Sequence, residues 1–313
     1  MNFTPSCSIV IPAYNEQDHL ESTLLSLSNQ SIPRESYEII VVDNGSTDKT
    51  TDLAEKYADR VLVVPELNVG AVRNQGIKSA SSDIIVCTDA DCVVEYTWLE
   101  RGISLLNEYP QHTFGGGLRP SNTSSWVEEK WLLNPNGKAF QQKSLMGSCI
   151  FIWKRDFEAV GGFLEDITSG EDSDLSERLE KQSIQVVINN ELSVIHNGGA
   201  KTIREFFKRQ IWHSENYYND FKKLLSDKVL FLTALYSANF ILILFFTFSH
   251  RLNLLLISLM FFLAVPAILS IKRIIRANYQ PTSLVDLLSI YSLDHIYILA
   301  RSIGSIKGIL KRE

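Results

Sequence analysis

The sharpest chemical feature of the sequence is a pair of aspartates, Asp89 and Asp91, separated by one residue. They follow the apolar run Ile84–Thr88, whose composition predicts a buried strand. Two carboxylates at this spacing can share a hard divalent cation, with phosphate oxygens and water completing its coordination shell. Such an ion neutralises a diphosphate leaving group and acts as a Lewis acid. We therefore favour a divalent-metal site over a solvated loop at this position.

A second cluster lies after the apolar stretch Glu38–Val42, where Asp43 could accept hydrogen bonds from a ribose or a base. The residues that follow, Asn44-Gly45-Ser46-Thr47-Asp48, also suit an ordinary turn that caps the next helix. Arg73 lies early in a predicted helix that faces the same edge. For Arg73 we favour a nucleotide contact over a surface salt bridge.

An acidic cluster, Gly170-Glu171-Asp172-Ser173-Asp174-Leu175, opens a predicted helix that runs to about Gln182. Acids are favoured at a helix N-terminus by the macrodipole, so helix capping is one explanation. The other explanation is a catalytic base, because a hydroxyl that attacks a substrate carbon needs a carboxylate within hydrogen-bond reach. The spacing leaves both open. His196, after a short apolar strand, is a candidate for the metal or a diphosphate, although a hydrogen-bonded structural histidine is favoured.

Short strands that alternate with helices must position these residues. Val- and Ile-rich runs alternate with helical stretches at about 17–29, 48–57 and 70–80. This order predicts an α/β fold with a mostly parallel sheet, in which ligands bind beyond the carboxyl ends of the strands. The predicted strands are Ser8–Pro12, Glu38–Val42, Arg60–Val64, Ile84–Thr88 and, later in the chain, Ser148–Trp153. Between the last two, Pro120–Gly137 is expected to be loop-rich.

The C-terminal third of the chain indicates a membrane association. Thr202–Leu225 mixes aromatic and basic residues, so we expect a helix that lies at an interface or packs on a soluble domain. Val229–Phe248 and Leu254–Ile271 are long enough to span a bilayer, with a buried soluble hairpin as the alternative. Lys and Arg at both outer ends place these ends in the cytosol by the positive-inside rule. The stretch 283–312 is amphipathic and ends with basic residues.

Charge is distributed unevenly along the chain. The net charge is −6, but residues 229–313 carry eight Lys/Arg and three Asp/Glu, a balance of +5, which leaves −11 for residues 1–228. An acidic front domain argues against nucleic acid as a partner, whereas a basic, apolar rear suits an anionic bilayer. The four cysteines lack the paired spacing of zinc or disulfide sites and are expected to be buried thiols. No signal-peptide pattern is seen, so the front domain is expected in the cytosol.

With these motifs the chain resembles glycosyltransferase family 2, whose members are inverting enzymes of the GT-A fold. The matching segments, in the family's order, are Ser8–Glu16, Val41–Asp48, Gly70–Gly76, Asp89–Asp91 and Gly170–Leu175. The resemblance implies that nucleotide contacts come from Pro12, Tyr14, Glu16, Asp43 and Arg73. It implies that Asp89 and Asp91 bind a Mg²⁺ or Mn²⁺ ion together with the diphosphate. It also implies that Asp172 is the base and that Glu171 supports Asp172 or contacts the acceptor.

Processive members of the family carry Gln-x-x-Arg-Trp before their membrane helices, whereas this chain has Arg209-Gln210-Ile211-Trp212-His213. We therefore expect transfer of one sugar, with a UDP-sugar favoured as donor, to a lipid-linked glycan or glycolipid in cell-envelope polysaccharide synthesis. The alternatives are a polyprenyl-phosphate acceptor, a nucleotidyltransferase and a catalytically lapsed membrane scaffold. The expected parts are a GT-A domain (1–200), an interfacial helix (201–228), two transmembrane helices (229–271) and a cytoplasmic amphipathic tail (272–313).

Overall fold

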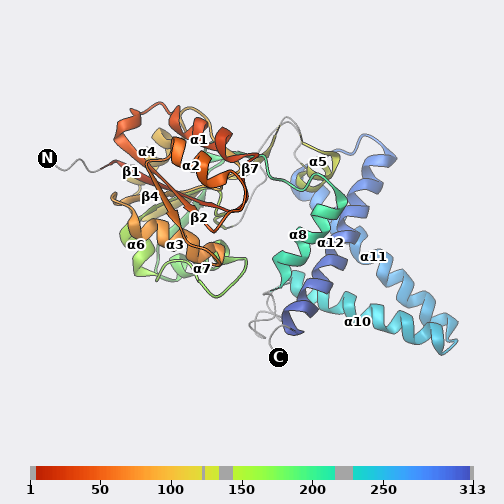
Figure 1. The fold of residues 1–313 in the computed structure, drawn as a ribbon. Coiled ribbons are helices and arrows are strands. Elements are labelled where there is room, and N and C mark those ends of the chain that lie inside the picture. The colour runs from red at the N-terminus through yellow and green to blue at the C-terminus, as the bar shows by residue number, and fades with distance from the viewer. Residues whose placement is uncertain (1–4, 122–123, 134–143, 216–227, 311–313) are drawn as a thin grey trace. The chain divides into compact units, whose positions relative to one another are not determined.

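The computed structural model describes residues 5–121, 124–133, 144–215 and 228–310. The chain forms two compact units, one from residues 1–122 and 137–199, the other from residues 123–136 and 200–313 (Figure 1). The first unit is an α/β domain and the second is helical. We describe each unit by itself.

A seven-stranded sheet, ordered β3-β2-β1-β4-β8-β6-β9, forms the centre of the α/β unit. Neighbouring strands are parallel except where β8 pairs antiparallel with both β4 and β6. The predicted mostly parallel α/β fold is therefore confirmed. The strands are β1 (Cys7–Ala13), β2 (Tyr37–Asp43), β3 (Arg60–Val63), β4 (Ile84–Cys87), β6 (His112–Gly115), β8 (Ile150–Trp153) and β9 (Gln185–Ile188).

Both faces of this sheet are buried, which explains why its strands read as continuous apolar runs. Along β1, Ile9 and Ile11 pack into one core and Val10 into the other, because successive side chains point to opposite faces. Helices α1, α2 and α4 cover the first face, and α3, α6 and α7 cover the second (Figure 1). These helices are α1 (Leu20–Ser28), α2 (Thr50–Tyr57), α3 (Val69–Ser79), α4 (Trp98–Glu108), α6 (Lys154–Ala159) and α7 (Glu171–Lys181).

A second, three-stranded sheet has the order β5-β10-β7. Its strands are β5 (Cys92–Val93), β7 (Leu118–Pro120) and β10 (Val194–His196), and short 3-10 helices occupy Arg34–Ser36 and Asn190–Leu192. Because β5 begins directly after Asp91, this small sheet continues from the carboxyl end of β4. The polar clusters after β1, β2 and β4 thus lie at one edge of the large sheet, as expected for its parallel strands.

Part of the region that was expected to be loop-rich is instead helical. Helix α5 (Trp126–Leu132) begins at a capping box, in which Ser125 and Glu128 each bind the other's backbone N–H. The sequence Ser125-Trp126-Val127-Glu128 carried this signal, but the surrounding Pro and Gly obscured it. Although we expected residues 1–200 to form one domain, α5 packs with the C-terminal helices.

The helical unit contains α5, α8 (Ile203–Ser214), α10 (Lys228–Phe248), α11 (Leu252–Ala277) and α12 (Leu284–Leu310). The helix expected over Thr202–Leu225 ends at Ser214, and residues 216–227 lie outside the described part of the chain. Helices α10 and α11 form a hairpin, and each is long and apolar enough to cross a membrane. Many of their large apolar side chains are exposed, among them Phe240, Ile241, Ile257, Met260 and Leu263.

Polar contacts join the helices of this unit. Arg273 of α11 forms a 2.6 Å ion pair with Asp294 of α12, whose carboxylate also accepts a hydrogen bond from Ser270. The Arg273 guanidinium donates to the carbonyl oxygens of Lys130 and Trp131 in α5 and lies 4.2 Å from the Trp131 ring centroid. These contacts join α5, a helix of seven residues, to α11.

Candidate active site

The loops after β1 and β2 are tied to each other. Asn15 adopts a φ of 53°, its backbone N–H donates to Ser46 Oγ at 2.9 Å, and its side chain accepts from the Thr47 N–H at 2.9 Å. Asp43 is buried and accepts hydrogen bonds from Ser46 and from the Thr51 hydroxyl. Asp43 is therefore held in one orientation at the carboxyl end of β2.

The other residues expected to contact a nucleotide lie on the loop after β1. The side chain of Tyr14 is 57% exposed, whereas Pro12 and Glu16 are partly buried. The backbone N–H of Glu16 donates to Thr50 Oγ1 at 2.7 Å, which joins this loop to α2. Because Ala13 pairs with Asp43 in the sheet, Tyr14 follows β1 at the same edge of the sheet, where an exposed ring can stack on a base while the acid binds a ribose.

Arg73, the last of the five nucleotide candidates, is deeply buried. Its Nη2 lies 2.6 Å from Asp89 Oδ1, and its Nη1 lies 2.6 Å from Glu171 Oε1. Burial by itself lowers the pKa of Arg73, but the two carboxylates outweigh it and hold the guanidinium charged. The interaction is thus a buried bridge between two loops rather than the surface salt bridge that the sequence left open.

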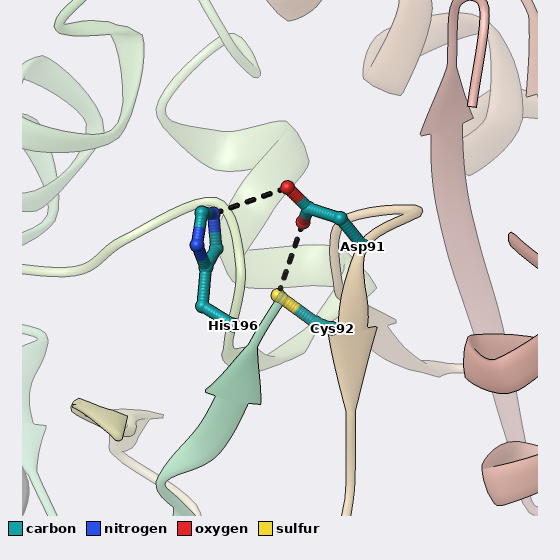
Figure 2. Close-up of side chains that lie close together, drawn as sticks. All are labelled: Asp91, Cys92 and His196. Carbon is teal, nitrogen blue, oxygen red and sulfur yellow. Dashed lines mark hydrogen bonds and ion pairs between the residues drawn. The ribbon is translucent and has the colours of Figure 1, made fainter. Parts of the chain in front are cut away.

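Asp91 has a different set of partners from Asp89. Its Oδ2 lies 3.2 Å from His196 Nε2, and its Oδ1 lies 3.5 Å from Cys92 Sγ (Figure 2). The antiparallel pairing of β5 with β10 places His196 opposite Cys92, which brings the imidazole to the aspartate. A Cβ added to Gly198 would lie 2.0 Å from Asp91 Oδ2, so glycine permits the close approach of this loop.

These donors fit a divalent cation. A carboxylate oxygen, the Nε2 of a histidine and a thiol sulfur lie within 4.8 Å of one another, and one ion could reach all three. Oxygen and imidazole ligands are those that Mn²⁺ and similar ions accept. Asp89 Oδ2 is not engaged by Arg73, whose contact is with Oδ1.

Cys92 is a residue of this cluster that the sequence analysis missed as a candidate ligand. Its position directly after Asp91 could have indicated this role. It was missed because the cysteines were judged only by the spacing between them. All four cysteines are free and buried, as expected. Burial raises the pKa of the Cys92 thiol well above its usual range, so the sulfur carries a proton unless a cation displaces it.

Asp172 is the second residue of α7, which begins after Gly170 at a φ of 86°. The backbone N–H of Gly147 donates to Asp172 Oδ2 at 3.2 Å, and that of Ser173 donates to Oδ1 at 2.7 Å. Burial raises the pKa of Asp172 to about 6, the negative charge of Glu171 adds to this rise, and the charge of Arg73 opposes it. A carboxyl with this pKa can take up a proton near neutral pH.

The chain's relationship to known proteins agrees with this geometry. Residues 8–155 match the family model described as Glycosyl transferase family 2. Residues 8–155 thus form a glycosyltransferase family 2 segment, and the protein is a glycosyltransferase that uses nucleotide-sugar donors. The matched segment contains the loops after β1, β2 and β4 together with Arg73, and it ends before Asp172 and His196.

Curated relatives of this family 2 enzyme are moderately similar to it. Glycosyltransferase AglE of Haloferax volcanii is 27% identical over 217 residues, covering 66% of this chain and 71% of AglE. Validoxylamine A glucosyltransferase of Streptomyces hygroscopicus subsp. limoneus is 25% identical over 231 residues, and the match spans 60% of this chain and half of that protein. Poly(ribitol-phosphate) beta-glucosyltransferase of Bacillus spizizenii is 44% identical over 91 residues, which are 27% of this chain and 14% of the relative.

Two solved structures share the GT-A fold of this enzyme. Mannosyltransferase PcManGT from Pyrobaculum calidifontis, in complex with GDP-Man and Mn²⁺, aligns with a TM-score of 0.62 at 16% identity, over 100% of this chain and 89% of its own. S. aureus TarS 1–349, in complex with UDP-GlcNAc, aligns with a TM-score of 0.51 at 17% identity, over 95% of this chain and 90% of its own. The predicted family and GT-A fold are thereby confirmed.

Proposed function

We propose that this family 2 enzyme transfers a single sugar to an acceptor hydroxyl with inversion at the anomeric carbon. Asp172 takes the proton of the acceptor hydroxyl, the oxygen forms a bond to C1, and the bond from C1 to the nucleoside diphosphate breaks. One displacement inverts the configuration. The observation that carries this proposal is the partly buried carboxyl of Asp172, held by two backbone N–H groups and with its pKa raised to about 6.

The nucleotide would bind to the loops after β1 and β2. Asp43, fixed by Ser46 and Thr51, accepts from the ribose or the base, while the exposed ring of Tyr14 covers it, with Pro12 and Glu16 shaping the same loop. This division of roles follows from the burial of Asp43 and the exposure of Tyr14. The diphosphate would then lie toward the carboxyl end of β4.

A divalent cation, Mn²⁺ or Mg²⁺, would be held by Asp91 and His196, with Asp89 and Cys92 beside them. When bound, the cation supplies positive charge that stabilises the leaving diphosphate. The relation between Asp91 and His196 supports a ligand role for the histidine over the purely structural one that was favoured from the sequence. PcManGT, in complex with GDP-Man and Mn²⁺, and TarS, in complex with UDP-GlcNAc, have the same fold, so UDP- and GDP-sugars are the first donors to test.

The acceptor would be a lipid-linked glycan or a glycolipid for cell-envelope polysaccharide. Helices α10 and α11 are long and apolar enough to span a membrane, and their exposed apolar side chains would face lipid. Lys272, Arg273 and Arg276 at the end of α11 favour a cytosolic location for that end, and the catalytic domain would face the cytosol. A polyprenyl-phosphate acceptor is the alternative, since a phosphate is already anionic and needs no base.

The experiment that tests the function is a screen of purified enzyme against a panel of nucleotide sugars. Donor cleavage that requires Mn²⁺ or Mg²⁺, and that is lost in Asp91→Asn, is the expected result. Absence of both cleavage and nucleotide binding across the panel would contradict the proposal. Loss of transfer to a sugar hydroxyl in Asp172→Asn, with donor binding retained, distinguishes a hydroxyl acceptor from a polyprenyl phosphate.

A further inference from the structure

Arg73 has the most constrained side chain in the catalytic region. It lies on α3, only 3% of it is exposed, and each terminal guanidinium nitrogen contacts a different carboxylate at 2.6 Å. Asp89 belongs to the turn after β4, and Glu171 is the first residue of α7. One planar cation therefore joins the turn after β4 to the start of α7, two segments that are distant in the sequence.

The space around the guanidinium is closed as well. A Cβ added to Gly147 would lie 2.1 Å from Arg73 Nη2, so a larger residue there would displace the guanidinium from its two carboxylates. The Phe163 ring centroid lies 5.6 Å from the guanidinium carbon on another side. Both terminal nitrogens contact carboxylates, and the Nε–H, which has no hydrogen-bond partner, is itself buried, so Arg73 presents almost no surface to a nucleotide.

We propose that Arg73 is a positioning residue that holds the metal-side acid Asp89 and the base-bearing helix α7 in register, and that it does not bind the nucleotide. Asp89 is two residues before Asp91, and Glu171 is directly before Asp172. Each end of the bridge is thus one or two residues from a group with a direct role in the proposed reaction. The assignment rests on the proposed function.

Gly147 belongs to the same arrangement. Its N–H donates to Asp172 at 3.2 Å, while its Cα side faces Arg73. The bridge therefore limits the position of Asp172 in two ways, through Glu171 in the chain and through the segment that contains Gly147. Lysine keeps the charge at position 73, but it has a single nitrogen and lacks the planar fork that reaches two carboxylates at once.

The test compares Arg73→Lys and Gly147→Ala with the unaltered enzyme in a metal-dependent donor-turnover assay. Because a misplacement of about 1 Å can cost roughly 100-fold in rate, we expect kcat to fall by about 100-fold in each variant. The dissociation constant of the nucleoside diphosphate, measured by calorimetry without a divalent cation, should stay within about threefold, because Asp43 and Tyr14 are unaltered. Arg101→Lys, a change of the same kind at a partly exposed ion pair, is the matched control and should leave both quantities unchanged.

Three results would overturn the assignment. A tenfold or larger rise in the nucleotide dissociation constant of Arg73→Lys with kcat retained would show that Arg73 binds the nucleotide. Equal losses of melting temperature and of nucleotide binding in both variants would show a general structural role. Absence of turnover by the unaltered enzyme would overturn the proposed function and this assignment with it.

Discussion

The Nε2 of His196 lies 3.2 Å from Oδ2 of Asp91, across the junction of strands β10 and β5. A third donor, the sulfur of Cys92, lies on the other side of the same carboxylate (Figure 2). The three side chains therefore form a cluster of carboxylate, imidazole and thiol groups that could hold a metal ion, which is a more specific arrangement than two aspartates in a loop.

Replacing His196 with alanine should weaken metal binding. Since loss of a group that holds or orients a metal ligand costs about 10- to 100-fold in affinity, we expect the Mn²⁺ concentration for half-maximal turnover to rise by at least about tenfold. Mn²⁺ binding can be followed directly by electron paramagnetic resonance. His250→Asn, in the turn between α10 and α11, is the control. Unchanged Mn²⁺ binding in His196→Ala would assign the histidine to a structural role.

Replacing Asp172 with asparagine should abolish transfer while leaving donor binding intact. A general base contributes about 10²- to 10⁴-fold, so kcat should fall by that range. Asp174→Asn, on the same helix but paired with Arg178, should retain most activity. Retention of full activity in Asp172→Asn would favour a phosphate acceptor that needs no base.

The pH dependence of turnover should report the carboxyl of Asp172. Its pKa is raised to about 6, and only the deprotonated form accepts a proton. The logarithm of kcat/KM should therefore rise with a slope of one as the pH increases toward about 6, and level off above it. A profile measured from pH 4.5 to 8, with metal occupancy verified at each point, checks this. An acid limb with its midpoint near the ordinary aspartate pKa would contradict the assigned environment of Asp172.

The ion pair between Arg273 and Asp294 should stabilise the helical unit. Asp294 is only 1% exposed, and it also accepts from Ser270, so Asp294→Ala leaves two donors without their acceptor. Because Arg273 is partly exposed, solvent screens this ion pair to some extent. We therefore expect a loss of about 2–4 kcal/mol in unfolding free energy. Lys181→Met removes an ion pair with Glu177 that is exposed on both sides and should cost less than about 1 kcal/mol. Denaturant unfolding in detergent measures the unfolding free energy of both variants. Equal losses in the two variants would contradict the prediction.

A charge on the apolar hairpin should impair membrane insertion. Ile241 of α10 is 66% exposed, and an arginine near the centre of a spanning helix costs about 2.5–3.5 kcal/mol. Ile241→Arg should therefore move a large share of the protein out of the carbonate-resistant membrane fraction, while Ile241→Leu should not. Equal retention of both variants would argue against a spanning role for α10.

Local patterns were sufficient to predict much of the catalytic domain. The runs that form β1, β2 and β4 are continuous and apolar because both sheet faces are buried, and each is followed by its polar cluster. Helix α7 was located from its acidic first turn, with boundaries correct to within about one residue. Helix α5 was missed because a strong local capping signal stands among turn-forming residues.

The sequence by itself determined the order of strands and helices, the family, and which acids lie at the ligand edge of the sheet. Those features depend on side-chain periodicity and on short motifs, which act over a few residues. Only the tertiary structure decided that Arg73 joins Asp89 to Glu171, and that His196 and Cys92 flank Asp91. These contacts depend on how α3 packs against the sheet and on the register of β5 with β10, which no local pattern specifies.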